Sequence, residues 1–434
     1  MQPPVSLLQP AADEPAAPEP GTPPLRALIF SQHYWPESFR INEITESLRQ
    51  RGCEVCVLTG QPNYPDGAVF PGYRAAAWGR ERHPAGYDIF RVPLVPRGGG
   101  TALRLAANYL SFIASASVLG PWLLRYKPID VIFVYGTSPI LQVIAAIVIA
   151  RLKGAVLVTW VQDLWPQSLE ATGYVRSPRL LAAVAMLVRW IYRRCDLLLV
   201  QSRAFVPTVS AMSGGVPVEV HPNPGEVAFD QRPTGERPAL QLGPGFNVVF
   251  AGNFGTAQAL ETVIDAAERL QGHPEIRFVL VGSGSRSNWL RHQLDARRLH
   301  NVSLAGRYAP ACMPSILAQA SALLVSLVRS PIMSQTVPSK IQAYLAAGRP
   351  VIASLDGEGA RVIAEAGAGI ACPAEDPAAL AEAVLKIYGL AAQEQARLGA
   401  SGMAYYRAHF QPKVLASQLE SRFRALLQNE HRIR

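Results

Sequence analysis

The sequence has few cysteines and few charged residues, and it lacks the marks of several protein classes. Five cysteines in 434 residues, an odd number, do not describe a disulfide framework, so a reducing cytoplasm is the natural compartment. Charged residues make up 17% of the chain without a run of five or six like charges, which argues against a nucleic-acid-binding tail. Glycine and proline follow no period, which excludes a collagen-like fibre, and 49% hydrophobic residues exclude wholesale disorder.

Signatures of metal binding and of common catalytic classes are also missing. The eight histidines are scattered without an H-x-x-x-H pair, and there is no D-x-D at a suitable position and no G-x-S-x-G turn. Cys53 and Cys56 form a lone C-x-x-C, but Cys56 lies in an apolar run, so we interpret them as buried strand thiols rather than a redox pair. We therefore expect neither a metal nor another cofactor.

The sequence does contain a repeated pattern of a short apolar strand, a glycine-rich or polar turn and a helix. In the first half, strands are expected at 26–32, 54–60, 88–92, 130–136, 155–163 and 196–202. In the second half, they are expected at 247–255, 276–284, 301–307, 322–328 and 349–355. Because most of these runs do not alternate with polar residues, helices should cover both faces of each sheet. The pattern predicts an α/β fold of two doubly wound, Rossmann-like domains.

The composition also predicts where these domains begin and end. Residues 1–24 are rich in proline, alanine and acid and lack the features of a signal peptide, so we expect a disordered leader. A first domain is expected at 25–222 and a second at 246–411, joined by a proline- and glycine-rich linker at 223–245. Ligands of such sheets bind at the carboxyl ends of the strands, so we expect the site in a cleft between two facing sheets.

Residues 101–127 could meet a membrane, because no charge lies between Arg104 and Arg125 and the stretch is long enough to span a bilayer. Polar residues recur at steps of four, three and four along one helical face, at Arg104, Asn108, Ser111 and Ser115. Pro121 is expected to interrupt this helix. Three interpretations stay open: a helix lying at the interface, a helix of the soluble core with its polar stripe outward, and a true span. A net charge of +9 and flanking basic residues fit the interface near anionic lipid, and these residues are Arg91, Arg97, Arg104, Arg125 and Lys127.

Glycine-rich turns in the second domain are candidate phosphate sites. Gly252, Asn253 and Gly255 precede a helix expected to start near Leu260, where free amides and the helix dipole would favour a phosphate. The alternative is that such turns only allow close packing.

A second segment of this domain carries a cation and a glycine-rich turn. Lys340 follows Ser339 at an expected helix start, where a cation suits an anionic partner rather than the helix dipole. Gly357, Glu358 and Gly359 precede another helix and could cradle a diphosphate with their amides, or could be solvated caps.

Polar and aromatic side chains follow three strands of the first domain. They are His33, Trp35, Glu37 and Arg40 after the first strand, Asn63 and Tyr64 after the second, and Asp163 and Trp165 after the fifth. We expect them on one rim, where aromatic faces and polar edges would suit a carbohydrate. Tyr34 and Trp35 should not both be core residues, and Arg40 could pair with a phosphate or carboxylate. The alternatives are a structural role for His33 and helix capping by Asp163.

Five segments together resemble bacterial glycosyltransferases of family 4, especially the subset that assembles O-antigen, capsule and other exopolysaccharide units on a lipid carrier. The segments are FSQHYWPESFRINEI, LTGQPNYPDG, VQDLWPQS, FAGNFGTAQALETVIDAA and VPSKIQAYLAAGRPVIASLDGEGARVI. The resemblance implies the GT-B fold, in which two Rossmann-like domains face each other across a cleft. The first domain would bind the acceptor and the second the nucleotide sugar, and a C-terminal helix at about 412–430 would return to the first.

The resemblance also implies an activity, which is retaining, metal-independent sugar transfer from a nucleotide sugar, by resemblance UDP-linked. The transferred sugar would be an N-acetylated or deoxy hexosamine. The acceptor would be a saccharide linked to a lipid pyrophosphate. The enzyme would be peripheral on the cytoplasmic face of the inner membrane, with an anionic lipid surface as partner. Lys340, Arg307 and the amides at 357–359 would stabilise the leaving diphosphate, and Asp163 would be the catalytic carboxylate.

The chain departs from the family at several positions. Gln335 and Ala343 stand where the family has two glutamates, and Gln167 stands where the subset has a glutamate. Asn253 and Gln258 occupy donor-site positions where the broader family has arginine and lysine. Two other functions therefore stay open, a GT-B nucleotide-sugar 2-epimerase and a non-catalytic GT-B binding subunit. A Rossmann dehydrogenase is disfavoured, because no dinucleotide fingerprint is intact.

Overall fold

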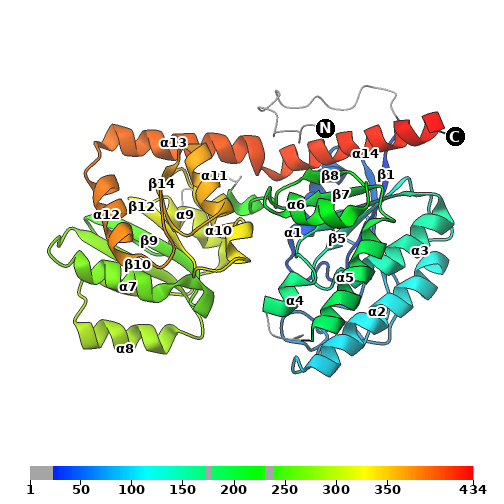
Figure 1. The fold of residues 1–434 in the computed structure, drawn as a ribbon, viewed down its shortest axis with the longest axis horizontal. Helices are drawn as coiled ribbons and strands as arrows, with labels where there is room; N and C mark the ends of the chain where they lie inside the picture. Colours follow the sequence, from blue (N-terminus) through cyan, green and yellow to red (C-terminus); the bar gives the residue numbers. More distant parts are fainter. Residues whose placement is uncertain (1–22, 172–176, 230–238, 434) are drawn as a thin grey trace. The chain divides into compact units, whose positions relative to one another are not determined.

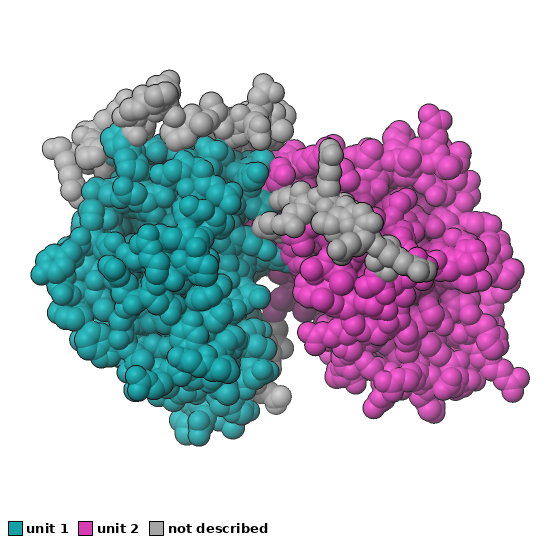
Figure 2. Space-filling view, turned by 180° about the vertical axis from the view of Figure 1, so that it is seen from behind, with its two compact units in different colours: residues 1–222, 412–434 teal, residues 223–411 magenta. Residues whose placement is uncertain are grey.

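The computed structural model describes residues 23–171, 177–229 and 239–433, and the chain forms two compact units. Unit 1 comprises residues 1–222 and 412–434, and unit 2 comprises residues 223–411 (Figure 2). Each unit contains its own sheet between helices, as the sequence pattern predicts (Figure 1). The expected leader at 1–24 lies almost wholly outside the described residues, as does part of the expected linker at 223–245.

Unit 1 is built on an eight-stranded sheet in the order β3-β4-β2-β1-β5-β6-β7-β8. Its strands are β1 (Arg26–Phe30), β2 (Glu54–Thr59), β3 (Gly79–Arg82), β4 (Asp88–Arg91), β5 (Val131–Gly136), β6 (Val156–Val161), β7 (Leu197–Val200) and β8 (Val218–Val220). All neighbours pair in parallel except β3 with β4. The edge strands β3 and β8 were not expected from the sequence, because neither is a long apolar run.

Helices cover both faces of this sheet. They are α1 (Arg40–Gln50), α2 (Ala102–Leu123), η1 (Ile140–Gln142), α3 (Val143–Lys153), α4 (Gln167–Ala171), α5 (Pro178–Tyr192), α6 (Phe205–Ser213) and α14 (Pro412–Ile433). One face packs on α2, α3, α5 and α6, and the other packs on α1 and the C-terminal α14. Leu419 and Phe423 of α14 are fully buried, and Glu420 pairs with Arg51 at 2.8 Å.

Helix α2 corrects two expectations. It continues through Pro121 to Leu123, because a proline in the last turn removes only one backbone bond near the helix end. Beyond the exposed Arg104, its polar stripe points into unit 1 rather than toward solvent, since Asn108 is fully buried and Ser115 donates to the carbonyl of Pro93 at 2.6 Å. Among the described helices, α2 alone is long and apolar enough to cross a bilayer by length and composition.

Unit 2 is built on a six-stranded parallel sheet in the order β11-β10-β9-β12-β13-β14. Its strands are β9 (Phe246–Asn253), β10 (Ile276–Ser283), β11 (Val302–Gly306), β12 (Ala322–Ser326), β13 (Val351–Ser354) and β14 (Gly369–Cys372). Its helices are η2 (Val227–Phe229), η3 (Thr256–Gln258), α7 (Leu260–Arg269), α8 (Ser287–Arg297), η4 (Pro310–Cys312), α9 (Met313–Leu317), η5 (Met333–Gln335), α10 (Ser339–Ala346), α11 (Glu358–Ala366), α12 (Pro377–Tyr388) and α13 (Ala392–His409). One core lies under α7 and α12 and a second under α10, α11 and α13, so the carboxyl ends of the strands remain available for ligands.

Candidate active site

Three loops of unit 1 carry the polar and aromatic residues predicted to form a rim, and a fourth loop that was not predicted joins them. They follow β1, β2, β5 and β6, which stand in the order β2-β1-β5-β6 within one parallel sheet. The carboxyl ends of neighbouring parallel strands share one edge, so the loops gather there. We call this edge the unit 1 rim.

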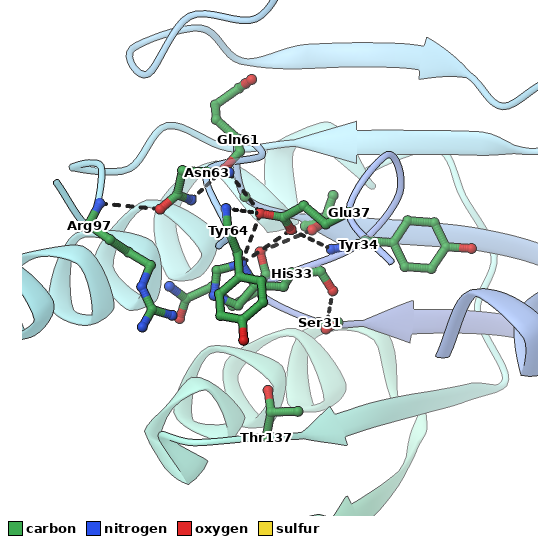
Figure 3. A network of polar contacts seen from close by, with 12 residues as sticks. Ser31, His33, Tyr34, Glu37, Gln61, Asn63, Tyr64, Arg97 and Thr137 are labelled. Carbon is green, nitrogen blue, oxygen red and sulfur yellow. Dashed lines mark hydrogen bonds and ion pairs between the residues drawn. The ribbon is translucent and has the colours of Figure 1, made fainter. Parts of the chain in front are cut away.

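Glu37 joins the loops after β1 and β2 in the unit 1 rim (Figure 3). Its side chain is buried, and Oε1 accepts hydrogen bonds from the backbone N–H groups of Asn63 and Tyr64, each at 2.7 Å. Oε2 accepts from the backbone N–H of Tyr34 at 3.1 Å. Three backbone donors are the partners that a buried carboxylate requires, so Glu37 fixes the relative position of the two loops.

His33 completes this network. Its Nδ1 lies 3.2 Å from both carboxylate oxygens of Glu37, and because a carboxylate only accepts, Nδ1 carries the proton. The ring lies near those of Phe39 at 5.4 Å and Tyr64 at 5.6 Å between centroids. Nε2 is buried and has no hydrogen-bond partner in the part of the chain that the structure describes. The carboxylate therefore fixes the imidazole orientation and leaves one nitrogen uncommitted.

Tyr64 and Arg97 give the rim an exposed aromatic ring beside a cation. The Tyr64 side chain is 39% exposed, and the Arg97 guanidinium lies 5.1 Å from its ring centroid. The backbone N–H of Arg97 donates to Asn63 Oδ1 at 3.2 Å, which ties this loop to the same network. A ring and a guanidinium can together receive a sugar face and an anionic group. Sequence reasoning noted Arg97 only as a basic flank, because its partner lies more than thirty residues away.

Asp163 lies directly after β6 and bonds to the loop after β5. Its Oδ2 accepts from the backbone N–H of Ser138 at 3.0 Å and from the Ser138 hydroxyl at 2.8 Å. Trp165 Nε1 donates to the same hydroxyl oxygen at 2.9 Å. The alternative of helix capping by Asp163 is wrong, because α4 begins only at Gln167 and the carboxylate bonds to Ser138 instead. Ser138 was missed in the sequence, where only the YGTSP turn after a strand marks it.

The other predicted rim residues are less available. Trp35 is partly buried, with its ring edge-on to His83 at 5.0 Å, and Arg40 lies 3.5 Å from Glu43 in α1 rather than free for a ligand. Tyr34 is a fully buried core residue, and its hydroxyl forms a hydrogen bond with that of Tyr87 at 2.7 Å. The tyrosine therefore buries its polar atom without an unpaired group.

Unit 2 holds a pocket of about 730 Å³ at the carboxyl ends of β9, β10 and β11. Six of the predicted donor-site residues line it, namely Gly252, Asn253, Gln258, Arg307, Ser339 and Lys340. Ala343, at a position where the family has a glutamate, lines it too. The lining is mixed polar and apolar, as expected for a site that binds a nucleotide.

Lys340 gives this pocket its positive charge. Its Nζ donates to Gln258 Oε1 and lies 3.7 Å from the centroid of the Phe250 ring. Burial lowers the Lys340 pKa from its ordinary value to about 7, and no ion pair involving Lys340 occurs among the described residues. A desolvated ammonium without a carboxylate is stabilised by an anion that enters the pocket.

Gly252 makes room for this lysine at the end of β9. Its φ is +142°, and a Cβ there would come within 2.6 Å of Lys340 Cε, so a larger residue would displace the ammonium. The glycine is therefore required by close approach, as well as by its backbone angle.

The remaining predicted donor residues do not line the pocket. Gly357 packs on the backbone of Ser334, where a Cβ would come within 2.0 Å of the Ser334 carbonyl oxygen. Glu358 pairs with Arg361 at 2.7 Å, and Gly359 is buried against Leu355. Gly255 also lies outside the lining. In the described structure, Lys340, Arg307 and Gln258 are thus brought together, and the turn at 357–359 is not.

The expectation that the protein binds no metal stays a prediction. Among the described residues, no group of three or more histidine, cysteine, aspartate or glutamate side chains could hold an ion. Burial raises the pKa of the Cys56 thiol to about 12. A thiol with so high a pKa is typical of an inert buried cysteine rather than of a metal ligand or a redox centre.

Comparison with known proteins matches each unit to a glycosyltransferase domain family. Residues 38–225 match the family described as "Glycosyl transferase 4-like domain", and residues 245–389 match "Glycosyl transferases group 1". WcaI of Escherichia coli K12, named as a colanic acid biosynthesis glycosyl transferase, is 29% identical over 75% of this chain and 82% of its own.

Solved structures show the same fold. The sucrose-phosphate synthase of Thermosynechococcus elongatus superimposes with a TM-score of 0.71 at 17% identity, covering 93% of this chain and all of its own. HepE of Anabaena, solved in complex with UDP, has a TM-score of 0.67 at 15% identity, covering 92% of this chain and all of its own. With two Rossmann-like units, each matched by a glycosyltransferase domain, the chain belongs to the family 4 glycosyltransferases and has the GT-B fold.

Proposed function

We propose that this enzyme transfers a sugar from a nucleotide sugar to a lipid-pyrophosphate-linked saccharide, with retention at the anomeric carbon and without a metal. The observation that carries the donor half is the unit 2 pocket, where Lys340 is desolvated and lacks a carboxylate partner. The HepE complex with UDP supports a UDP-linked donor, and the name of WcaI supports a role in cell-surface polysaccharide synthesis. An N-acetylated or deoxy hexosamine is the proposed sugar class.

In this proposal, unit 2 stabilises the leaving group. A nucleoside diphosphate gains negative charge as the glycosidic bond breaks, and preorganised cations lower the barrier most where water is excluded. Lys340 and Arg307 line the same pocket and would supply that charge. Gln258 would release its hydrogen bond with the ammonium to make room for a phosphate oxygen.

Unit 1 would bind the acceptor through its rim. The Tyr64 ring and Arg97 offer a stacking face and a cation for a saccharide carrying a pyrophosphate. Asp163, held by Ser138, would orient the attacking hydroxyl or stabilise positive charge on the sugar. Since an acceptor of this kind is held in a bilayer, we place the enzyme as a peripheral protein on the cytoplasmic face of the inner membrane.

The decisive experiment measures release of nucleoside diphosphate from UDP-, GDP- and TDP-sugars, with and without an extract of lipid-linked oligosaccharides. We expect release from one donor that rises when the extract is present. Donor binding without release across the panel would favour the non-catalytic GT-B subunit, for which Gln335 and Ala343 are the sequence argument. An altered free nucleotide sugar without release would favour the epimerase.

The role of Asp163 has its own test. Asp163→Ala should reduce turnover by about 100-fold or more while leaving nucleotide binding and the melting temperature nearly unchanged, since the carboxylate caps no helix. A melting temperature that falls in proportion to activity would show that the carboxylate serves mainly to join the loops after β5 and β6.

A further inference from the structure

Apart from Arg104 in its first turn, the outward face of α2 is apolar. Its exposed apolar residues recur at steps of three and four along the helix and include Leu103, Ala106, Leu110, Ala114, Val118 and Trp122. Leu103 is 81% exposed and Val118 is 72% exposed. A surface helix of a water-soluble domain normally shows the reverse arrangement, with its polar face in water. This orientation leaves a continuous apolar stripe exposed, and Trp78, itself exposed, extends it at its end with its ring 5.2 Å from that of Trp122.

The inward face of α2 is held by polar bonds. Asn108 Nδ2 donates to the carbonyl of Val95 at 2.6 Å, and Asn108 Oδ1 accepts from Gln32 Nε2 at 2.7 Å. Crossing a bilayer would break these bonds and remove Phe112 and Ala116 from the core of unit 1. The helix is therefore anchored to the sheet, and only its outer stripe is available to an apolar environment.

Helix α5 adds a second apolar stripe next to the first. Both α2 and α5 contact η1 and cover the same face of the unit 1 sheet. The exposed apolar residues of α5 include Leu180, Ala183, Met186 and Trp190. We call the two stripes together the α2–α5 face.

The charges within the two segments that carry the α2–α5 face all have one sign, although Lys127 is paired with Asp88 of β4 at 2.8 Å. Residues 89–129 and 171–195 contain no aspartate or glutamate, although the whole chain has 32 of them. The Arg125 guanidinium lies 4.2 Å from the Trp122 ring, and that of Arg194 lies 3.8 Å from the Trp190 ring. Tryptophan with a neighbouring arginine is typical of the boundary between acyl chains and headgroups, where the ring is partly buried and the cation meets phosphate.

We propose that the α2–α5 face docks this enzyme on an anionic lipid bilayer, lying in the plane of the interface without spanning it. The proposed lipid-linked acceptor explains why the enzyme would dock on a membrane, and in that respect the inference rests on the proposed function. The docking surface itself is argued from the exposed residues of α2 and α5 alone. A protein partner would be expected to offer or require charges of both signs, whereas this face offers only cations. Apolar burial would hold the helices, and the surrounding arginines would select anionic headgroups.

Vesicle binding by the full chain, without donor or acceptor, tests the proposal independently of glycosyl transfer. We expect sedimentation with vesicles of phosphatidylcholine and phosphatidylglycerol, weaker binding to phosphatidylcholine alone, and weakening by salt. Leu110→Gln with Val118→Gln should lower the partition coefficient at least about tenfold. Because both side chains are exposed, the melting temperature should not change. The matched apolar control, Leu110→Met with Val118→Ile, should bind like the wild type.

The contribution of the basic residues to vesicle binding is tested by two double variants, one on the α2–α5 face and one on unit 2. Arg125→Glu with Arg189→Glu should weaken binding to anionic vesicles, whereas Arg269→Glu with Arg397→Glu, exposed on unit 2, should not. The proposal would be overturned if the wild type did not bind vesicles, or if both charge-reversal pairs weakened binding equally. It would also be overturned if the wild type formed a dimer instead of binding vesicles and Leu110→Gln with Val118→Gln broke that dimer. Resistance of the cellular membrane-bound protein to alkaline carbonate extraction would overturn the in-plane orientation.

Discussion

The carboxylate side chains of the unit 1 rim have hydrogen-bond partners within the protein, whereas the buried lysine of the unit 2 pocket lacks a partner of opposite charge in the described part of the chain. In unit 1, Glu37 receives three backbone hydrogen bonds and the Nδ1–H of His33, and Asp163 receives two bonds from Ser138. In unit 2, Lys340 has the Gln258 amide and the Phe250 ring as neighbours. Among the described residues, no carboxylate of the pocket lining pairs with it. The first site is complete before a ligand arrives, and the second needs a negative charge from outside.

This difference indicates what each site binds. A rim whose carboxylates already have their hydrogen-bond donors offers oriented polar atoms and an aromatic face, which suit the neutral hydroxyl groups of a sugar. A pocket with an uncompensated ammonium pays a desolvation penalty that only an anion relieves, which suits a diphosphate. Variants that remove the charged group should therefore lower stability in unit 1 and lower ligand affinity in unit 2.

The largest stability effect is expected for Glu37→Gln. The amide would place an NH2 group opposite backbone donors and leave buried N–H groups unpaired, which should cost about 3 kcal/mol of unfolding free energy. Tryptophan fluorescence in a denaturant titration reports this directly, because six of the seven tryptophans lie in unit 1. Glu382→Gln, which removes an exposed pair with Lys386, is the control and should change stability by less than about 0.5 kcal/mol. Equal small losses would show that the Glu37 network does not support the unit 1 rim.

Lys340→Met should act on affinity rather than on stability. Loss of a charge-assisted contact should weaken UDP binding by about 10- to 100-fold in a calorimetric titration. The unliganded protein should not lose stability, because the variant removes a desolvated charge. Lys386→Met, at an exposed pair on α12, should leave the affinity unchanged. An unchanged dissociation constant for Lys340→Met would contradict the assignment of the pocket.

The lowered Lys340 pKa predicts two pH dependences. A bound anion favours the ammonium, so UDP affinity should be highest below pH 7 and fall by up to about tenfold per pH unit above it. Without ligand, the unfolded lysine binds a proton that the folded one has lost between about pH 7 and its ordinary pKa. The free energy of unfolding should therefore rise with pH in that window. This contribution is lost as pH falls from the ordinary lysine pKa to about 7, and below pH 7 it should not change further. Both slopes should disappear in Lys340→Met, and a persistent slope would assign the titration to another group.

All strands except β3, β8 and β14 were predictable, as was the gathering of the candidate residues at strand ends, because buried apolar runs define parallel strands and their carboxyl ends share an edge. The partners of each side chain were not. Glu37 meets Asn63 only through the pairing of β1 with β2, and Asp163 meets Ser138 only through that of β5 with β6. The periodicity of α2 revealed a polar stripe but not its direction, which the carbonyls of Pro93 and Val95 decide. The turn at 357–359 resembled a phosphate cradle because packing against Ser334 leaves no mark in the sequence.

The smallest effect is expected for Ser138→Ala. The variant removes the hydroxyl that links Trp165 to Asp163, but the Ser138 backbone N–H still donates to the carboxylate at 3.0 Å. The lost hydroxyl bond to the carboxylate is charge-assisted and worth about 1.5 kcal/mol, so turnover should fall by about tenfold with an unchanged Michaelis constant for the donor. Because the donor pocket lies wholly in unit 2, a raised Michaelis constant for the donor would mean that the two sites are coupled, and the division of labour between rim and pocket would have to be abandoned.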